Sequence, residues 1–291
     1  MATLREIKGH ISSVGSIAQV TRAMELISAA RAQRLSERVE RARPFAVKSW
    51  EVLNHLAIAA QEQVQQDPLF CGYGQTNTIG TILITSNRGM AGAYNQNIIE
   101  SALENATSAA AATEFITIGR EGREALLRGG HSIHADFSNL ADTTEVSGMS
   151  PVARVVLDGF RDQVFSQVKI AYTPFEQGRL GQPVVRQLLP ICPETPAQAR
   201  QYIYEPAPSE LLIALVPRLV RFQIYQAFLE SLAAENMSRR LAMHEATRNA
   251  QDIMEHLKIT YNKVRQQTIT SEITDILGAQ TALDGRGRQG V

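Results

Sequence analysis

Little in this chain of 291 residues points to disulfides or to membrane insertion. Its two cysteines, Cys71 and Cys192, are far apart in the sequence and form no metal-ligand spacing. Two lone cysteines indicate a reducing compartment and argue against a disulfide framework. No run of about 18 apolar residues occurs, so we expect no transmembrane helix. The N-terminus lacks the apolar segment of a signal peptide. We therefore expect a cytoplasmic protein that meets a membrane only through partners.

Aromatic residues and net charge are also scarce. Aromatics make up 6% of the chain, and the formal net charge is zero. Residues 1–50 nevertheless hold nine Lys and Arg against four Asp and Glu. Four of these arginines recur every three or four residues and so share one helix face: Arg31, Arg34, Arg38 and Arg41. Nucleic acid, an acidic protein partner and plain solvation stay open for this stripe, although zero net charge and few aromatics count against nucleic acid.

What the sequence does contain is helical periodicity at both ends. In the N-terminal segment, from about Thr3 to Val64, apolar residues recur in steps of three and four, which mark one helix face. They are Leu4, Ile7, Ile11, Val14, Ile17, Val20, Met24 and Ile27. We expect Pro44 to bend or interrupt this helix. A stripe of this length needs a partner helix.

The C-terminal segment has neither glycine nor proline between Pro217 and Gly278. Every seventh residue from Leu215 forms a seam in which Asn236 is the polar exception: Phe222, Leu229, Asn236, Met243, Ala250, Leu257 and Val264. A second set lies three positions further on: Tyr225, Leu232, Ala246 and Ile253. This heptad pattern predicts a coiled-coil helix from about Ser209 to Leu283, which would be ~110 Å long. Its obvious partner is the N-terminal helix.

The middle of the chain alternates strands with helices. Short apolar runs predict strands at 81–85, 114–118, 168–172 and 184–189, and helices are expected at 94–106, 121–127 and 152–164. We therefore predict an α+β fold: a long antiparallel two-helix coiled coil with an inserted small α/β, Rossmann-like domain. The expected boundaries are 1–64 for the first helix, 65–204 for the α/β domain, 205–283 for the second helix and 284–291 for a flexible tail.

No catalytic constellation is evident. Gly89-Met90-Ala91-Gly92 follows a strand and precedes a helix, where phosphate-binding turns occur, yet it matches no phosphate-binding motif. A structural turn is the favoured interpretation, and a bound nucleotide is the alternative. His131 and His134 are three residues apart without a third ligand nearby, so we predict no metal site, and we also predict no cofactor.

The two ends of the chain resemble a known family. Residues 11–34, with Thr21-Arg22-Ala23-Met24-Glu25-Leu26, are similar to the N-terminal helix of the gamma subunits of F-type ATP synthases. Residues 223–231 and 261–274 resemble the start and the C-terminal signature of that family's second helix. Ser86 to Asn95 fits its first strand-to-helix turn. Departures such as His244, Arg248 and Gly278-Ala279 suggest a divergent branch, such as the alternative F-type ATPases.

The resemblance implies a non-catalytic rotor shaft. Such a shaft stands inside a ring of alpha and beta subunits, which hold the nucleotide sites, and its foot joins the epsilon subunit and the ring of c subunits. It also implies contacts with the catalytic ring at Arg265, Gln266, Thr270, Glu272 and Asp275, with Arg22, Met24 and Arg239 on the facing region. The expected location is the cytoplasmic face of a prokaryotic membrane. Two other hypotheses remain: an α/β nucleotide-binding or enzymatic domain on a coiled-coil oligomerisation arm, and a coiled-coil scaffold or nucleic-acid binder.

Overall fold

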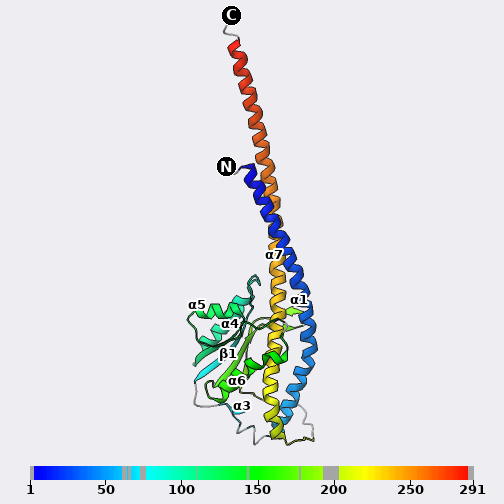
Figure 1. The fold of residues 1–291 in the computed structure, drawn as a ribbon, viewed down its shortest axis with the longest axis vertical. Helices are drawn as coiled ribbons and strands as arrows, with labels where there is room; N and C mark the ends of the chain where they lie inside the picture. The colour runs from blue at the N-terminus through cyan, green and yellow to red at the C-terminus, as the bar shows by residue number, and fades with distance from the viewer. Residues whose placement is uncertain are drawn as a thin grey trace. The chain divides into compact units, whose positions relative to one another are not determined.

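The computed structural model describes residues 3–60, 64, 67–72, 77–109, 111–142, 144–176, 178–192 and 203–287, with side chains except at 275 and 278–287. Two long helices dominate Figure 1: α1 (Leu4–Ala59, blue) and α7 (Pro208–Gly287, yellow to red). The chain divides into two compact units. We call residues 1–26 with 241–291 the terminal pair, and residues 27–240 the body.

In the terminal pair, α1 and α7 pack side by side along a regular seam. The Thr247 hydroxyl lies 2.8 Å from the Thr21 hydroxyl, and His244 Nδ1 lies 3.2 Å from Glu25 Oε1. A Cβ atom on Gly15 would lie 3.5 Å from Met254 Sδ. Residue numbers thus fall along α1, from Glu25 to Gly15, as they rise along α7, from His244 to Met254. The predicted antiparallel pairing of the two chain ends is confirmed.

The predicted seam was wrong at several positions. On α7 most predicted positions are buried or partly buried, namely Met243, Ala246, Ala250, Leu257 and Val264, whereas Ile253 is 50% exposed. Thr247, Met254 and Tyr261 were not predicted and are also buried or partly buried. On α1 the buried and partly buried residues include Ala18, Thr21 and Glu25, whereas Ile17 and Val20 are exposed. The seam mixes large apolar residues with small and polar ones, and other large apolar residues lie outside it, so apolar size alone does not mark it.

The helix boundaries differ modestly from the predictions. α1 runs unbroken through Pro44 and ends at Ala59 rather than near Val64. α7 continues to Gly287, so the helix includes the first residues of the predicted tail, whose remainder, 288–291, lies outside the described residues. Each residue added to an existing helix gains a hydrogen bond without a new nucleation cost, so a long helix tolerates a few weak residues at its end.

The body contains a five-stranded sheet in the order β3-β2-β1-β4-β7. Its strands are β1 (Thr78–Ile84), β2 (Ala112–Ile118), β3 (Ile133–Asp136), β4 (Gln167–Tyr172) and β7 (Val184–Leu189). The first four are parallel, and β7 is antiparallel to β4. β5 (Phe175–Glu176) and β6 (Arg179–Leu180) form a separate small hairpin. The sheet confirms the predicted α/β domain, although β3 was not predicted.

The two faces of the sheet are covered by different helices. Ile82 and Ile84 point to one face, where they share a core with α6 (Ser150–Arg161), α1 and α7. Leu83, Phe115 and Ala171 point to the other face, against α4 (Tyr94–Ser108) and α5 (Arg120–Arg128). Two short helical turns, α3 (Pro68–Cys71) and η1 (Val146–Met149), complete the body. This alternation follows from the period of two along a strand.

Within the described residues, one helix is long and apolar enough to be compared with a membrane span. It lies in α7, where an 18-residue window reaches a mean hydropathy of 1.3, and 56% of that window is buried inside the protein. Since α7 contributes Leu219, Phe228 and Leu229 to the core of the body, this apolar character has a use within the fold.

Candidate functional site

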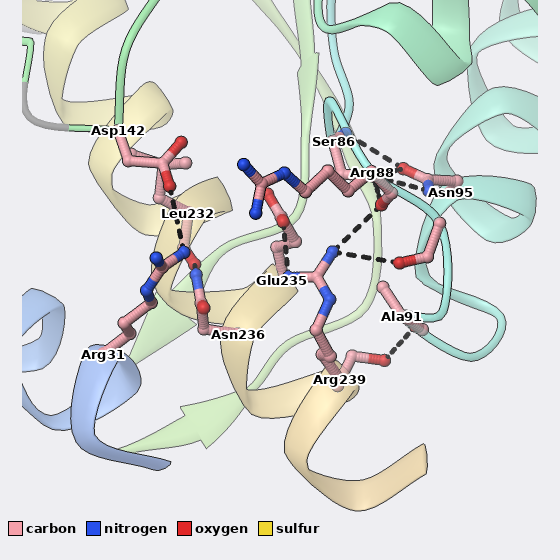
Figure 2. Close-up of polar contacts among 12 residues, drawn as sticks. Arg31, Ser86, Arg88, Ala91, Asn95, Asp142, Leu232, Glu235, Asn236 and Arg239 are labelled. Atoms are coloured by element: carbon pink, nitrogen blue, oxygen red, sulfur yellow. Dashed lines mark hydrogen bonds and ion pairs between the residues drawn. The ribbon is translucent and has the colours of Figure 1, made fainter. Parts of the chain in front are cut away.

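α7 crosses the carboxyl edge of the sheet at β4 and β1. The backbone N–H of Thr173, just after β4, donates to Ser231 Oγ at 3.3 Å. Ser238 Oγ donates to the carbonyl of Ala91 at 2.7 Å, and Arg239 donates to the carbonyls of Arg88 and Gly89 at 2.9 and 3.3 Å (Figure 2). We call these bonds the edge contact. In open α/β sheets a ligand usually binds where strand order reverses, which here is between β1 and β4. In this protein the helix lies there.

A buried ion pair supports the edge contact. Arg239 Nη1 lies 2.7 Å from Glu235 Oε1, and the two side chains are only 9% and 11% exposed. Burial raises the pKa of Glu235, and the Arg239 guanidinium partly offsets that effect. Because two carbonyls and one carboxylate share this guanidinium, Arg239 holds α7 against the turn after β1.

The turn itself is held by side chains (Figure 2). Asn95 Oδ1 accepts from the Ser86 backbone N–H at 3.0 Å, and Ser86 Oγ donates to the Arg88 carbonyl at 2.7 Å. Gly92 and Met90 both take left-handed backbone conformations, with φ of 58° and 62°. The turn presents carbonyl oxygens to a helix, whereas a phosphate requires N–H donors. This geometry supports the structural interpretation of the turn.

The backbone N–H groups in the first turn of α5 donate hydrogen bonds within the body. The backbone N–H groups of Arg120, Glu121 and Gly122 donate to Asn87 Oδ1, the Ser86 carbonyl and Thr85 Oγ1, at 2.9–3.1 Å. Gly119 makes this approach possible, since its φ is 110° and a Cβ there would lie 2.2 Å from the Thr85 carbonyl oxygen. A helix N-terminus beside a parallel sheet is a common anion site, but here residues after β1 accept these hydrogen bonds.

Asn236, the polar residue of the predicted seam, and two arginines of the N-terminal stripe also make contacts within the body. Asn236 is 2% exposed, and its Nδ2 donates to the Leu232 carbonyl at 2.8 Å (Figure 2). Arg31 pairs with Asp142 at 3.5 Å, and Arg38 donates to the Tyr225 hydroxyl at 3.1 Å. These contacts favour a role within the protein for part of the stripe.

The predicted contact residues fall into three places. Arg265, Gln266, Thr270 and Glu272 are exposed on α7, and Asp275 lies in the same helix with its side chain outside the described residues. Arg22 and Met24 lie on α1 in the terminal pair. Arg239 instead lies inside the body, in the edge contact. Only 9% of the Arg239 side chain is exposed and thus accessible to another subunit.

Sequence reasoning missed the residue that joins Arg22 to α7. Glu25 accepts from Arg22 Nη1 at 2.8 Å and faces His244 at 3.2 Å. Burial acts to raise the pKa of Glu25, but the hydrogen bonds from Arg22 and His244 outweigh it and leave the pKa below its usual value. The signal was present, because Glu25 follows Leu4, Ile11 and Ala18 at intervals of seven.

The two histidines weighed as a metal pair contact other side chains. His134 Nδ1 lies 2.9 Å from Glu114 Oε2, and the His131 ring meets that of Phe115 edge-on. The described part of the chain contains no group of three or more His, Cys, Asp or Glu side chains placed to hold a metal ion.

In this protein α7 occupies the sheet edge at which ligands usually bind, and the two chain ends pair antiparallel. These two features define a helical stalk protein with an inserted α/β domain. Comparisons with known proteins agree. The family model described as ATP synthase matches residues 3–283. The ATP synthase gamma chain of Dehalococcoides mccartyi strain BAV1 is 37% identical over 97% of this chain and 100% of its own length. That of Legionella pneumophila strain Corby is 32% identical, again over 97% of this chain and all of its own.

Solved structures share the fold. A chain of the Euglena gracilis mitochondrial ATP synthase, from a structure of its OSCP, F1 and c-ring, aligns with a TM-score of 0.67 at 17% identity, covering 96% of this chain and 94% of that one. A chain from the rotor of the same enzyme aligns with a TM-score of 0.65 at 16% identity, covering 91% and 98%. The chain belongs to the ATP synthase gamma-chain family, and its function is that of the central stalk of an F-type ATP synthase.

Proposed function

We propose that this chain is a non-catalytic rotor subunit that transmits rotation between a ring of c subunits in the membrane and a ring of alpha and beta subunits. One observation carries the proposal. All described α7 side chains after Val264, from Arg265 to Thr274 with Ile276 and Leu277, are exposed, although the helix continues to Gly287. A helix this exposed gains its stability from packing against partners.

The exposed part of α7 has a face suited to such partners. Ile269, Ile273, Ile276 and Leu277 are 43–66% exposed and follow each other at helical spacing on one side. Exposed apolar stripes of this kind mark interaction surfaces. A smooth apolar face can turn within a collar, because it makes no directional bonds.

Polar side chains next to this face are proposed to engage the catalytic ring at defined angles. They are Arg265, Gln266, Thr270, Glu272 and Asp275 on α7, with Arg22 and Met24 on α1. The Thr270 hydroxyl donates to the backbone carbonyl of Gln266 at 2.8 Å, and the Gln266 side chain is exposed. Arg265 and Glu272 offer charges that are exposed to water.

The remaining partners are proposed from the family. The epsilon subunit and the c-ring would contact the body, and the complex would lie on the cytoplasmic face of a prokaryotic membrane. Gamma chains of three bacteria among the relatives, including that of Flavobacterium johnsoniae, support the prokaryotic assignment. Nucleotide hydrolysis would belong to the partner ring.

Reconstitution tests the coupling role. Alpha and beta subunits from the same source are produced with and without this chain, and ATP hydrolysis is measured. We expect a stable particle with strong hydrolysis only when the chain is present, and no hydrolysis by the chain alone. Equal hydrolysis by alpha and beta without the chain would reject a coupling role.

A pair of variants tests the contact residues. Arg265→Ala in the exposed part of α7 should lower hydrolysis by the assembled particle roughly tenfold, the effect of losing about 1.4 kcal/mol. Lys258→Ala is the control, because Lys258 is also exposed but lies within the paired part of α7. Equal activities of the two variants would argue against Arg265 as a contact.

A further inference from the structure

His244 of α7 meets a largely buried carboxylate of α1 inside the terminal pair. Its Nδ1 lies 3.2 Å from Glu25 Oε1. The Glu25 side chain is only 11% exposed, whereas that of His244 is 57% exposed. Protons from the solvent therefore reach the imidazole, while the carboxylate that faces it is largely shielded from water.

The Glu25 carboxylate is ionised at neutral pH and contacts both helices. Its Oε2 accepts from Arg22 Nη1 at 2.8 Å, within α1. Burial acts to raise the pKa of Glu25, but the hydrogen bonds and charges of Arg22 and His244 outweigh it, so the pKa stays below its usual value. Since the two partners use different oxygens, neither excludes the other. The link from Glu25 to α7 therefore depends on the state of His244.

The strength of this link depends on the charge of the imidazole ring. Histidine ordinarily changes charge between about pH 5 and 8. A charged ring carries a proton on both nitrogens, so Nδ1 always donates to Glu25. A neutral ring carries one proton, and whenever that proton is on Nε2 the bare Nδ1 faces the carboxylate. A hydrogen bond between ionised groups is also roughly twice as strong as a neutral one. The link is therefore strongest when His244 is charged.

Other charged groups near His244 act on it more weakly than Glu25 does. Arg240 and Arg248 lie one turn before and one turn after it on α7, and Glu245 is its neighbour in the sequence. The two arginines oppose a charge on the ring, but all three side chains are exposed, so water screens them. Arg22, on α1, keeps its charge throughout this pH range. The response to pH is therefore set by His244 facing Glu25.

The link belongs to the buried seam rather than to the outer surface. On α7 it is adjacent to Met243 and one turn from Thr247, and both residues are 7% exposed. The Thr247 hydroxyl in turn lies 2.8 Å from the Thr21 hydroxyl of α1. A change in the strength of the link therefore acts where the two helices pack against each other.

We propose that His244 and Glu25 form a pH-sensitive clasp that holds α1 to α7 in the terminal pair. While His244 is charged, the clasp stabilises the pairing of the two helices. As the pH rises and His244 loses its proton, this contribution is lost, and α1 separates from α7 more often. Because Glu25 must be ionised as well, the clasp is strongest at about pH 5–6. It is a property of the chain itself and does not depend on the proposed contacts with the catalytic ring.

Hydrogen exchange of the full chain, corrected for its intrinsic pH dependence, tests the clasp. Between about pH 5.5 and 8.5, protection of residues 15–25 and 243–254 should fall about fivefold, since the charged hydrogen bond is replaced by a neutral one. Protection of β1, in the body, should stay constant and is the internal reference. Constant protection of the terminal pair over this range, or no protection of it at any pH, would overturn the proposal.

Variants of His244 show whether its charge is responsible. His244→Lys keeps a positive charge over the whole range and should keep high protection up to about pH 8.5. His244→Gln is neutral and should show low protection throughout, and Glu25→Gln should also abolish the response to pH. His256→Gln removes another exposed histidine of α7 and is the matched control, which should respond as the unmodified chain does. A pH response that survives in His244→Gln, or equal protection of the lysine and glutamine variants, would refute the proposal.

Discussion

The same two helices pack in different ways in the terminal pair and in the body. Of the six buried residues described in the terminal pair, four are small or polar, Ala18, Glu25, Thr247 and Ala250, and two are large and apolar, Ile7 and Met243. In the body the most buried residues of the two helices include large apolar ones, such as Leu53, Leu56, Val220 and Leu229, beside small ones such as Ala233 and Ala234. Each fully buried large apolar side chain stabilises a protein by about 1.5–3 kcal/mol. The body therefore carries its own stability, whereas the terminal pair gains less from its seam.

The exposed side of the terminal pair shows the complementary trend. Ile17, Val20 and Ile259 are 55–61% exposed, which places apolar residues away from the seam. This distribution suits a helical pair in which the seam joins the two helices and the outer surface packs against other proteins. Local stability is thus related to the proposed role, and substitutions in either region test this relation.

The largest expected effect concerns the buried ion pair of the body. Arg239→Met leaves the Glu235 carboxylate buried without its partner, which should lower the free energy of unfolding by about 3–5 kcal/mol. The double variant with Glu235→Gln should recover most of that loss. In the terminal pair, Arg22→Met should change little, because the Arg22 side chain is 55% exposed and water screens its pairing. Urea unfolding measures all three, and equal losses for Arg239→Met and Arg22→Met would remove the distinction between the regions.

A matched pair of leucines tests apolar packing at equivalent heptad positions. Leu229, in the body, is 1% exposed, whereas Leu257, in the terminal pair, is only partly buried. Leu229→Ala should lower the free energy of unfolding by roughly 2–5 kcal/mol. Leu257→Ala should cost less than half as much and act mainly on the hydrogen exchange of residues 4–26. A larger effect at Leu257 would contradict the comparison.

These positions also show what the sequence could predict. Apolar steps of three and four identified the N-terminal helix, and heptad spacing identified the C-terminal one. Their pairing followed because each long apolar stripe needs a partner helix. Strands β1, β2, β4 and β7 followed from short β-branched, apolar runs. In the terminal pair, Ile17, Val20 and Ile253 were wrongly assigned to the seam, because apolar residues occupy both the inner and the outer faces of the helices. Periodicity alone cannot tell a seam from a surface reserved for partners.

The candidate sites were harder to predict, since they depend on distant segments. Arg239 was expected to face a partner, yet it bonds to carbonyls about 150 residues away in the sequence. β3 was missed because only two of its four residues are apolar enough to form a recognisable run.

Acidification should affect the two regions in opposite directions. The pKa of Glu25 is lowered in the folded protein, so its contribution to stability is present above the unfolded pKa of about 4.3 and is lost as the pH falls through the folded value. The pKa of Glu235 is raised, so its contribution is present below about 4.3 and is lost as the pH rises through the folded value.

Hydrogen exchange, corrected for its intrinsic pH dependence, measures both responses. Residues around Thr21 and Thr247 should lose protection below about pH 4, and Glu25→Gln should remove that loss. Residues 231–239 should not lose protection through Glu235 over the same range. Parallel loss of protection in both regions, unchanged by Glu25→Gln, would show that neither carboxylate controls local stability.

The smallest expected effect lies at the hydroxyl pair of the terminal seam. The Thr247 hydroxyl is within 2.8 Å of both the Met243 carbonyl and the Thr21 hydroxyl, and the Thr21 hydroxyl also reaches the Ala18 carbonyl at 3.1 Å. Each hydroxyl therefore keeps an acceptor within its own helix. Thr247→Val should cost about 1 kcal/mol or less, and Thr21→Val combined with Thr247→Val should be neutral or stabilising, since two apolar groups of the same shape then face each other. Hydrogen exchange of residues 18–25 and 243–250 reports the change. A loss well above 1 kcal/mol in the double variant would mean that polar bonds, rather than close approach of small residues, hold the terminal pair together.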